Sequence, residues 1–324
     1  MGKPTAVVLF NLGGPDSLEA VEPFLFNLFS DPDIFKIPLG FITQKWFARS
    51  ISRRRAPQAS IGYRAIGGKS PQLEITRAQA RALNQALSDE GDYETFVCMR
   101  YWHPMADNVV TALKEKDIDD VILLPLYPQY SLTTTGSSYN DFRRACQRNN
   151  YQPKISLIKQ WYEEPDYHQA IADAITAEAV KLPTPNPGNI ELLFSAHGLP
   201  QKIIARGDPY EKHIRATVEA VNKILGWPHT TLCYQSRVGP LKWLQPYTRN
   251  TIIEKAKQGS KQILIYPIAF VSDHIETLHE LGMEYADVAQ RHGVESYRVV
   301  PALNTDPGLI NTLKELVLSR DHER

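Results

Sequence analysis

Short apolar runs alternate with longer amphipathic segments along the whole chain. The apolar runs have the length of buried strands and lie at 6–11, 94–101, 121–127, 154–161, 190–196, 230–236, 262–270 and 296–302. The segments between them have helical periodicity and lie at 71–89, 104–115, 137–149, 165–181, 209–225, 273–291 and 305–319. Alternation of this kind is typical of parallel sheets covered by helices. We therefore expect an α/β protein with Rossmann-like lobes.

Three predicted strand exits in the first half resemble three in the second half, in the same order. The similar pairs are "LFNLGGP" with "LFSAHGLP", "FVCMRYWHP" with "LCYQSRVGP", and "VILLPLYPQYS" with "ILIYPIAFVS". The shared order indicates a duplicated unit. We predict an N-terminal lobe over 1–162 and a C-terminal lobe over 163–324, whose last helix packs back, with a ligand-binding cleft between the lobes.

An insertion at about 30–70 distinguishes the first half from the second. It carries an apolar run from Phe35 to Ile51, followed by Arg53, Arg54 and Arg55. An insertion at a strand exit of an open α/β sheet lies beside the crevice where ligands bind. Two interpretations remain open: a satellite core with a solvated basic end, or a lip that offers apolar surface and guanidinium groups to a flat anion or a membrane surface.

Composition and charge exclude several classes of protein. The 324 residues include 36 basic and 36 acidic side chains, and a balanced charge disfavours nucleic acid as a partner. The three cysteines form no CxxC pair, which disfavours a disulfide framework, structural zinc or an iron–sulfur cluster. The N-terminus shows no signal-peptide pattern, and no apolar run has the length of a membrane span. We expect a cytoplasmic protein.

Neither glycine-rich stretch of the chain has the spacing of a nucleotide-binding loop. "NLGGP" is not GxGxxG, and in "GYRAIGGKS" Gly62 and Lys69 are one residue too far apart for a P-loop. Such loops depend on their register, because successive backbone N–H groups must converge on one phosphate. We expect no nucleotide site.

The histidine of "LLFSAHGLP" is the first candidate for chemistry. His197 ends a predicted strand, and Gly198 and Pro200 then turn the chain away. A neutral imidazole at the carboxyl end of a strand would point into the crevice, where it is suited to accept a proton. The alternative is a buried histidine bonded to a neighbouring carbonyl.

The segment "FVSDHIETLHELGMEYADV" is the second candidate. Asp273 and Glu276 fit a helix N-cap with its reciprocal carboxylate, which is a purely structural interpretation. On the functional interpretation, His274 and Glu276 share the crevice with the histidine of the equivalent strand exit. Glu280 and Glu284 continue an acidic stripe at every fourth residue. Carboxylates mixed with imidazole suit Fe²⁺, Mg²⁺ or Zn²⁺, so the stripe is a candidate path for divalent cations or protons.

Aromatic and guanidinium groups follow other strand exits. Arg100, Tyr101 and Tyr127 come from the first half, and Trp243 comes from the second. Two interpretations are open. These side chains either border the core with their polar tips at the surface, or they form the aromatic contacts and the anion-binding group of a site for a planar acidic ligand.

The motifs taken together resemble those of the ferrochelatases, which insert ferrous iron into protoporphyrin IX. The resemblance covers about residues 5–318. It is carried by "NLGGP", "YRAIGGKSP", "RYWHP", "YPQYS", "TTGSS", "LFSAHGLP", "RGDPY", "QSRVGP" and "PIAFVSDHIETLHEL". It implies two lobes of the chelatase fold, and the duplicated unit agrees with that.

The resemblance assigns a role to each matching position. His197 becomes the essential histidine that accepts a proton or contacts the metal, and Glu276 becomes the carboxylate facing it across the macrocycle. Asp273 and His274 support this pair, and Glu280 and Glu284 extend the acidic path. The porphyrin-binding positions implied are Leu12, Arg54, Arg55, Tyr63, Ser70, Arg100, Tyr101, Tyr127, Ser236, Trp243 and Phe270.

The chain departs from the family's pattern at two places, and several alternative functions are open. Leu12 stands where other members place Met or Tyr, and an aliphatic side chain cannot ligate metal. No cysteine-bearing extension follows Arg320, so we expect no [2Fe–2S] cluster and no tightly bound cofactor. Protoporphyrin IX and Fe²⁺ are the expected partners, with peripheral contact to the inner face of the plasma membrane and a homodimer as further options. The alternatives are a coproporphyrin III ferrochelatase, a cobalt or nickel chelatase of the same fold, and a non-catalytic porphyrin or metal carrier.

Overall fold

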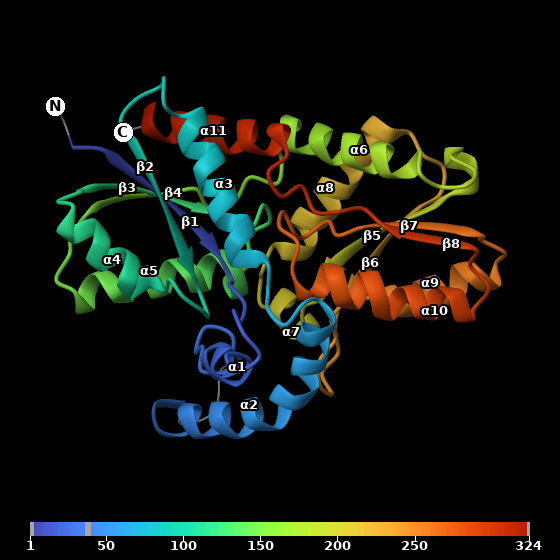
Figure 1. The fold of residues 1–324 in the computed structure, drawn as a ribbon, viewed down its shortest axis with the longest axis horizontal. Helices are drawn as coiled ribbons and strands as arrows, with labels where there is room; N and C mark the ends of the chain where they lie inside the picture. The colour runs from blue at the N-terminus through green and yellow to red at the C-terminus, as the bar shows by residue number, and fades with distance from the viewer. Residues whose placement is uncertain (1–2, 36–39, 323–324) are drawn as a thin grey trace. The chain divides into compact units, whose positions relative to one another are not determined.

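Each half of the chain folds around its own four-stranded parallel sheet (Figure 1). This computed structural model describes residues 3–35 and 40–322. The chain divides into two compact units, one formed by Met1–Trp161 with Ile310–Arg324 and the other by Tyr162–Leu309.

The first sheet has the strand order β2-β1-β3-β4. Its strands are β1 (Thr5–Asn11), β2 (Tyr93–Met99), β3 (Asp120–Pro125) and β4 (Lys154–Leu157). The central strands β1 and β3 are buried along almost their whole length. Burial on both faces is the rule for a parallel sheet covered by helices, and it explains why these runs are continuously apolar.

Helices cover both faces of the first sheet. They are α3 (Gln72–Ala86), α4 (Ala106–Glu115), α5 (Ser137–Arg148), which continues a short π-helical turn η1 (Leu132–Gly136), and α11 (Pro307–His322). Val8 and Phe10 of β1 pack against α4 and α5 in one core. α3 lies on the opposite face, where the Thr95 hydroxyl of β2 donates to the Ala80 carbonyl.

The chain between β1 and α3 forms a helical pair beyond the carboxyl end of β1 (Figure 1). Its helices are α1 (Val21–Phe29), which precedes the predicted insertion, and α2 (Gly40–Ala65), which lies within it. Phe35 contacts the rings of Phe29 and Phe47, with ring centroids 5.2 and 6.5 Å apart. The insertion therefore packs against α1 through a small aromatic core. Residues 36–39 of the predicted apolar run lie outside the described residues.

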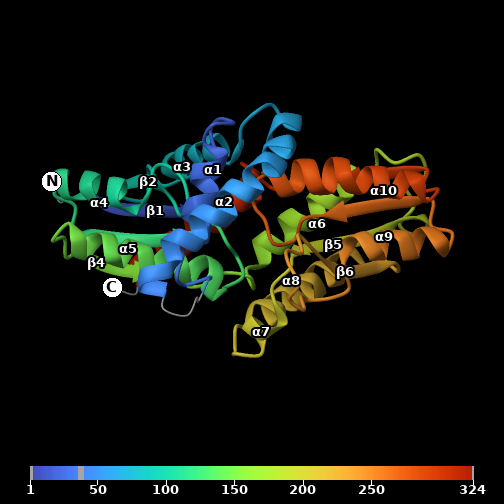
Figure 2. The ribbon, with the colours of Figure 1, turned by 90° about the horizontal axis from the view of Figure 1, so that it is seen from below.

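The second sheet has the order β6-β5-β7-β8. Its strands are β5 (Glu191–His197), β6 (Thr230–Gln235), β7 (Gln262–Tyr266) and β8 (Ser296–Val299). The helical segments of this unit are α6 (Pro165–Ala179), η2 (Pro187–Asn189), α7 (Gln201–Ile204), α8 (Tyr210–Leu225), α9 (Thr248–Lys257), η3 (Glu276–Glu284) and α10 (Tyr285–Arg291) (Figure 2). On one face, Leu193 and Ile265 pack against Ile252, Leu281 and Ala289 of α9, η3 and α10.

The predicted fold class is confirmed, with local differences. Every predicted strand is present, and the two sheets share one strand order. The segment predicted as a helix over 273–291 starts as the π-helix η3 and becomes α-helical only at Tyr285. The pattern did not predict α1, α2 or α9. None of the helices in the described part of the chain combines the length and the hydropathy that crossing a bilayer requires.

Candidate active site

His197 is the last residue of β5, and hydrogen bonds fix its backbone from two sides. The Tyr210 hydroxyl, on the first turn of α8, donates to the His197 carbonyl at 2.9 Å, and the Gly198 N–H donates to the Gln235 carbonyl at 2.9 Å. A side chain at Gly198 would approach that carbonyl to 2.9 Å, so this position requires glycine. The imidazole keeps 33% of its surface exposed at this strand exit.

Glu276 contacts the imidazole directly. Nδ1 of His197 lies 3.1 Å from Oε2 of Glu276, and Nε2 of His274 lies 3.3 Å from the same oxygen. The expectation that His197 and Glu276 face each other across a macrocycle is therefore wrong for this structure. No ring fits between atoms at hydrogen-bond distance. The two residues form one hydrogen-bonded histidine–carboxylate pair.

The electrostatics of the pair follow from this contact. Burial disfavours the charged imidazole, but the Glu276 carboxylate outweighs it and raises the pKa of His197 above its ordinary value of 6.5. Burial alone would raise the pKa of Glu276, but the imidazoles of His197 and His274 hold it well below its ordinary value of 4.5. Glu276 is accordingly an anion at neutral pH and stabilises a proton on His197.

Aromatic rings surround the imidazole edge. The rings of Trp243 and Phe270 lie nearly perpendicular to that of His197, with centroids 6.5 and 6.3 Å away. The second ring nitrogen, Nε2, has no hydrogen-bond partner among the described residues. With Nδ1 bonded to a carboxylate, Nε2 is the nitrogen that remains available to a substrate proton.

The structural interpretation of Asp273 as a helix N-cap is wrong. The residue before η3 is Ile275, and no side chain caps this helix end. The Asp273 carboxylate instead accepts from the Thr277 hydroxyl at 2.8 Å and from the Asn304 side-chain amide at 2.7 Å. It is a supporting group beside the histidine–glutamate cluster.

The three glutamates of the acidic stripe have different surroundings. Glu280 accepts hydrogen bonds from the Ser236 N–H and the Tyr285 hydroxyl, at 2.9 and 2.7 Å. Ser236 has a φ of 63°, a left-handed conformation that Glu280 helps to hold. Glu284 is half exposed and lies 3.3 Å from Nδ1 of His279. Glu280 thus supports the backbone after β6, and of the three glutamates Glu284 is exposed while Glu276 and Glu280 are half-buried.

The metal-ligand expectation reduces to the pair His197 and Glu276. Among residues 3–35 and 40–322, no three or more histidine, cysteine, aspartate or glutamate side chains form a group that could hold a metal ion. One imidazole and one carboxylate are fewer protein ligands than the three or four that hold a resident metal ion such as zinc.

Arg100 and Tyr101 are buried in a polar network of the first unit. Asp31, whose side chain is fully buried, accepts from Arg100 Nη2 at 2.9 Å and from the Tyr101 hydroxyl at 2.7 Å. Ser137 bonds to both Asp31 and Arg100. Burial raises the pKa of the Tyr101 phenol well above its usual range. The donors of both residues are therefore used inside the unit. Tyr127 is likewise buried, in the core beneath α4 and α5.

The other positions predicted to bind porphyrin differ in accessibility. Tyr63 and Ser70 are buried, and Leu12 is half-buried against the α4–α5 core. Arg54 is exposed on α2, and the guanidinium of Arg55 lies 5.9 Å from the centre of the Phe29 ring. Among these, Arg54 is the group most open to a ligand.

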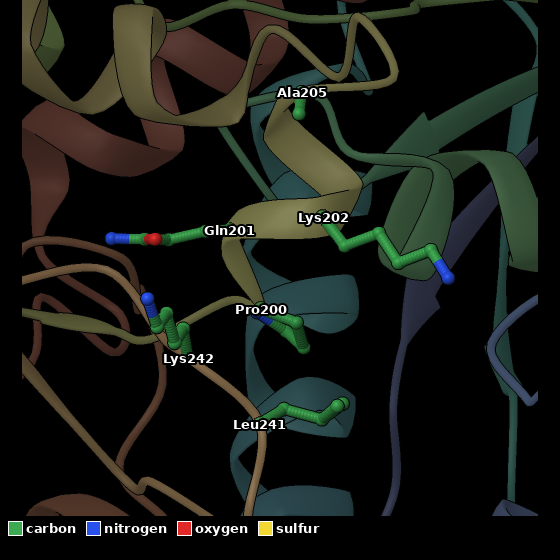
Figure 3. Close-up of a pocket in the computed structure, with 6 residues that line it drawn as sticks. All are labelled: Pro200, Gln201, Lys202, Ala205, Leu241 and Lys242. Carbon is green, nitrogen blue, oxygen red and sulfur yellow. The ribbon is translucent and has the colours of Figure 1, made fainter.

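A shallow pocket of about 290 Å³ follows the strand that carries His197 (Figure 3). Its lining residues are Pro200, Gln201, Lys202, Ala205, Leu241 and Lys242. The Gln201 N–H donates to the Lys242 carbonyl, and the Leu244 N–H donates to the Leu199 carbonyl, at 2.9 Å each. These bonds fasten the chain after His197 to the segment that carries Trp243. The pocket does not include His197 or Glu276.

Comparison with known proteins decides the family. The ferrochelatase family model matches residues 4–321. A curated protein named ferrochelatase from Geotalea uraniireducens (strain Rf4) is 46% identical over 317 residues, covering 98% of this chain and 98% of its own length. The chain belongs to the ferrochelatase family. A second relative named ferrochelatase, from Gloeothece citriformis (strain PCC 7424), is 44% identical and covers 98% of this chain and 83% of its own.

Solved structures support the fold of this ferrochelatase-family chain. SirB from Bacillus subtilis with Fe³⁺ aligns with a TM-score of 0.54 at 11% identity, covering 76% of this chain and 89% of its own. DR2241 from Deinococcus radiodurans, described as structurally similar to chelatases, aligns with a TM-score of 0.52 at 13% identity, covering 100% of this chain and 56% of its own. At these identities the likeness concerns the fold alone.

The sequence alone assigned no role to three supporting residues of the candidate site. Tyr210 holds the His197 carbonyl, Gln235 lies beside His197 in the sheet and bonds to Ser195, and Asn304 bonds to Asp273. Tyr210 ends the motif "RGDPY", so the sequence singles it out, but the sequence does not show that it bonds to His197. Asn304 follows Asp273 by 31 residues, and no local pattern connects them.

Proposed function

We propose that this ferrochelatase-family protein is a lyase that inserts Fe²⁺ into protoporphyrin IX to give protoheme and two protons, the terminal step of heme biosynthesis. The family supports the reaction, and one observation within the chain supports its chemistry: a partly exposed imidazole backed by a carboxylate anion at the carboxyl end of a central strand. Metal insertion needs a base, because two pyrrole N–H protons must leave.

His197 is the proposed proton acceptor. Glu276 holds the proton of Nδ1, so that the lone pair of Nε2 faces outward, and it stabilises the imidazolium that forms when Nε2 takes a pyrrole proton. The raised pKa of His197 favours that transfer. Because one imidazole accepts one proton at a time, His197 must pass the first proton on before it takes the second.

We propose that iron contacts His197 and Glu276 only in passing. The pair offers one nitrogen and one carboxylate, which suit Fe²⁺ as ligands. Glu284 on η3 is the accessible outer carboxylate of the proposed path, while Asp273, His274 and Glu280 shape it through their hydrogen bonds.

The insertion is the proposed contact for the porphyrin edge. Arg54 is exposed on α2 and can pair with a propionate, and Arg55 lies against the Phe29 ring. Tyr63, Ser70, Ser236, Trp243 and Phe270 are the further proposed porphyrin contacts. On the same helix Trp46 is 75% exposed, which supports peripheral contact of α2 with the inner face of the plasma membrane.

Anaerobic Fe²⁺ mixed with porphyrin and protein tests this function. We expect the Soret band of protoporphyrin IX to convert to that of protoheme, faster than the spontaneous reaction. Coproporphyrin III in a parallel cuvette tests the substrate preference. A carrier would shift the porphyrin spectrum on binding without turning it over, and that result would overturn the proposal.

A further inference from the structure

We propose that Asn304 is a positioning residue for the metal-insertion reaction, acting through Asp273 and His274 on Glu276. The inference rests on the proposed function, because it concerns the same acid–base pair. Asn304 lies in the segment after β8, whereas His197 ends β5 and Glu276 follows β7.

Asn304 and Asp273 bind each other reciprocally. The Asn304 Nδ2 amide donates to Oδ2 of Asp273 at 2.7 Å, and the backbone N–H of Asp273 donates to Oδ1 of Asn304 at 2.9 Å. Two further bonds join the same segments: the Asn304 N–H donates to the Val271 carbonyl, and the Ala302 N–H donates to Oδ1 of Asp273. The carboxylate of Asp273 is thereby fixed in place and in orientation.

The fixed carboxylate orients the helix start that carries the cluster. Oδ1 of Asp273 accepts from the Thr277 hydroxyl at 2.8 Å, and the oxygen of that hydroxyl accepts the His274 N–H at 3.0 Å. His274 then reaches Oε2 of Glu276 with its Nε2, while its Nδ1 is held by the Ser272 carbonyl at 3.2 Å. Each bond in this series places the next group, and the series ends on the oxygen that holds His197.

Asparagine meets two requirements at this position. The backbone at residue 304 has a φ of 52°, in the left-handed region that glycine, asparagine and aspartate tolerate best. The side chain must also donate to a carboxylate and accept from a backbone N–H. Glycine satisfies the backbone alone, and aspartate would set a second carboxylate against Asp273.

These properties define the variants. Asn304→Gly keeps the backbone conformation and removes both side-chain bonds, and Asn304→Asp keeps the acceptor and removes the donor. Asn150→Gly is the matched control, because Asn150 is also left-handed, with a φ of 48°, and lies exposed after α5. We expect Asn304→Gly to lower kcat about ten- to hundredfold, the range typical of groups that orient a functional side chain, with KM for porphyrin nearly unchanged. Asn304→Asp should lose at least as much, and Asn150→Gly should keep wild-type kinetics.

A double-mutant cycle separates positioning from general destabilisation. If Asn304 acts through Asp273, Asp273→Ala combined with Asn304→Gly should lose no more kcat than Asp273→Ala alone. Multiplied losses in the double variant, or a wild-type kcat in both Asn304 variants, would overturn the inference. So would a kcat loss matched by an equal loss of folded protein in the melting curve. A wild-type protein that inserts no iron would instead refute the proposed function itself.

Discussion

Nδ1 of His197 lies 3.1 Å from Oε2 of Glu276, so the two groups at the heart of the site share a hydrogen bond. His274 approaches the same oxygen from within its own segment, at 3.3 Å. One carboxylate oxygen therefore serves two imidazoles, and only one of them, His197, has a ring nitrogen available for chemistry.

Removing the charge of Glu276 should move the pH dependence of the reaction. His197 accepts a proton only when it is neutral, so kcat should rise as the pH increases through its raised pKa. Glu276→Gln removes the anion that raises this pKa, and the acidic limb of the kcat–pH profile should shift toward lower pH while the maximal kcat falls. Stopped-flow assays across the pH range measure both. An acidic limb that stays in place would mean that another group limits the rate.

The same pair should stabilise the fold within a definite pH window. The raised pKa of His197 contributes stability that is complete below its unfolded value of 6.5 and is lost as the pH rises through the folded value. The lowered pKa of Glu276 contributes stability that is complete above 4.5 and is lost at lower pH. Glu276→Gln should therefore lower Tm more at about pH 5.5 than at about pH 9. Equal Tm losses at both pH values would contradict the ion pair.

Loss of the imidazole should stop turnover and spare binding. His197→Ala removes the proton acceptor, and we expect kcat to fall at least about a hundredfold, as for other general bases. Porphyrin affinity, measured by fluorescence titration, should change little. His229→Ala is the matched control, because His229 is exposed at the start of β6 and has no side-chain bond among the described residues. Wild-type turnover in His197→Ala would remove the basis of the mechanism.

The guanidinium groups of α2 should contribute to binding rather than to rate. Arg54→Ala together with Arg55→Ala should raise KM for porphyrin several-fold with kcat retained, because a paired propionate loses a charge-assisted bond. Arg81→Ala on α3 removes an exposed arginine elsewhere in the same unit and serves as the control. An unchanged KM would show that the insertion does not bind the porphyrin edge.

The buried network of the first unit should matter for stability. Asp31→Asn removes the fully buried carboxylate beside the Arg100 guanidinium, which keeps its bond to Ser137 and the more distant carboxylate of Asp141, at 3.4 Å. Breaking a buried ion pair costs about 3–5 kcal/mol, and Asp141 keeps the expected loss near the lower end of that range. Urea unfolding measures it, with Asp117→Asn on an exposed ion pair as control. A raised porphyrin KM without loss of stability would show instead that Arg100 binds substrate.

The sequence predicted those elements whose signal is local. Buried strands such as 121–127 are continuous apolar runs, and the motifs at His197 and Glu276 mark the ends of strands. The sequence did not predict α9, because Thr248–Lys257 is mainly polar and its buried face combines Ile252 with the polar Thr248 and Thr251. It predicted an α-helix where η3 forms, because the apolar positions of the segment alone do not distinguish i→i+4 from i→i+5 bonding.

Contacts between residues far apart in the sequence could not be predicted either. The resemblance placed Arg100 and Tyr101 in a ligand pocket, and only the structure shows Asp31 occupying their donors. The resemblance also placed Glu276 across the macrocycle from His197. No pattern in a sequence gives the distance between residues 79 positions apart, so only the structure corrects that placement. The reciprocal pair of Asn304 and Asp273 was hidden for the same reason.

The equal strand order of the two sheets has a consequence for how such a protein can evolve. Asn11 and His197 are each the last residue of the first strand in their sheet, and each pairs with the last residue of the neighbouring strand. Asn11 is buried and bonds to Gln72 and Thr76, whereas His197 faces outward to a carboxylate. After a duplication, this position at the strand end can hold a buried, hydrogen-bonded side chain in one unit and a reactive side chain in the other. Because each sheet packs in a core cluster of its own, such a change at one strand end leaves the packing of the other sheet unaltered.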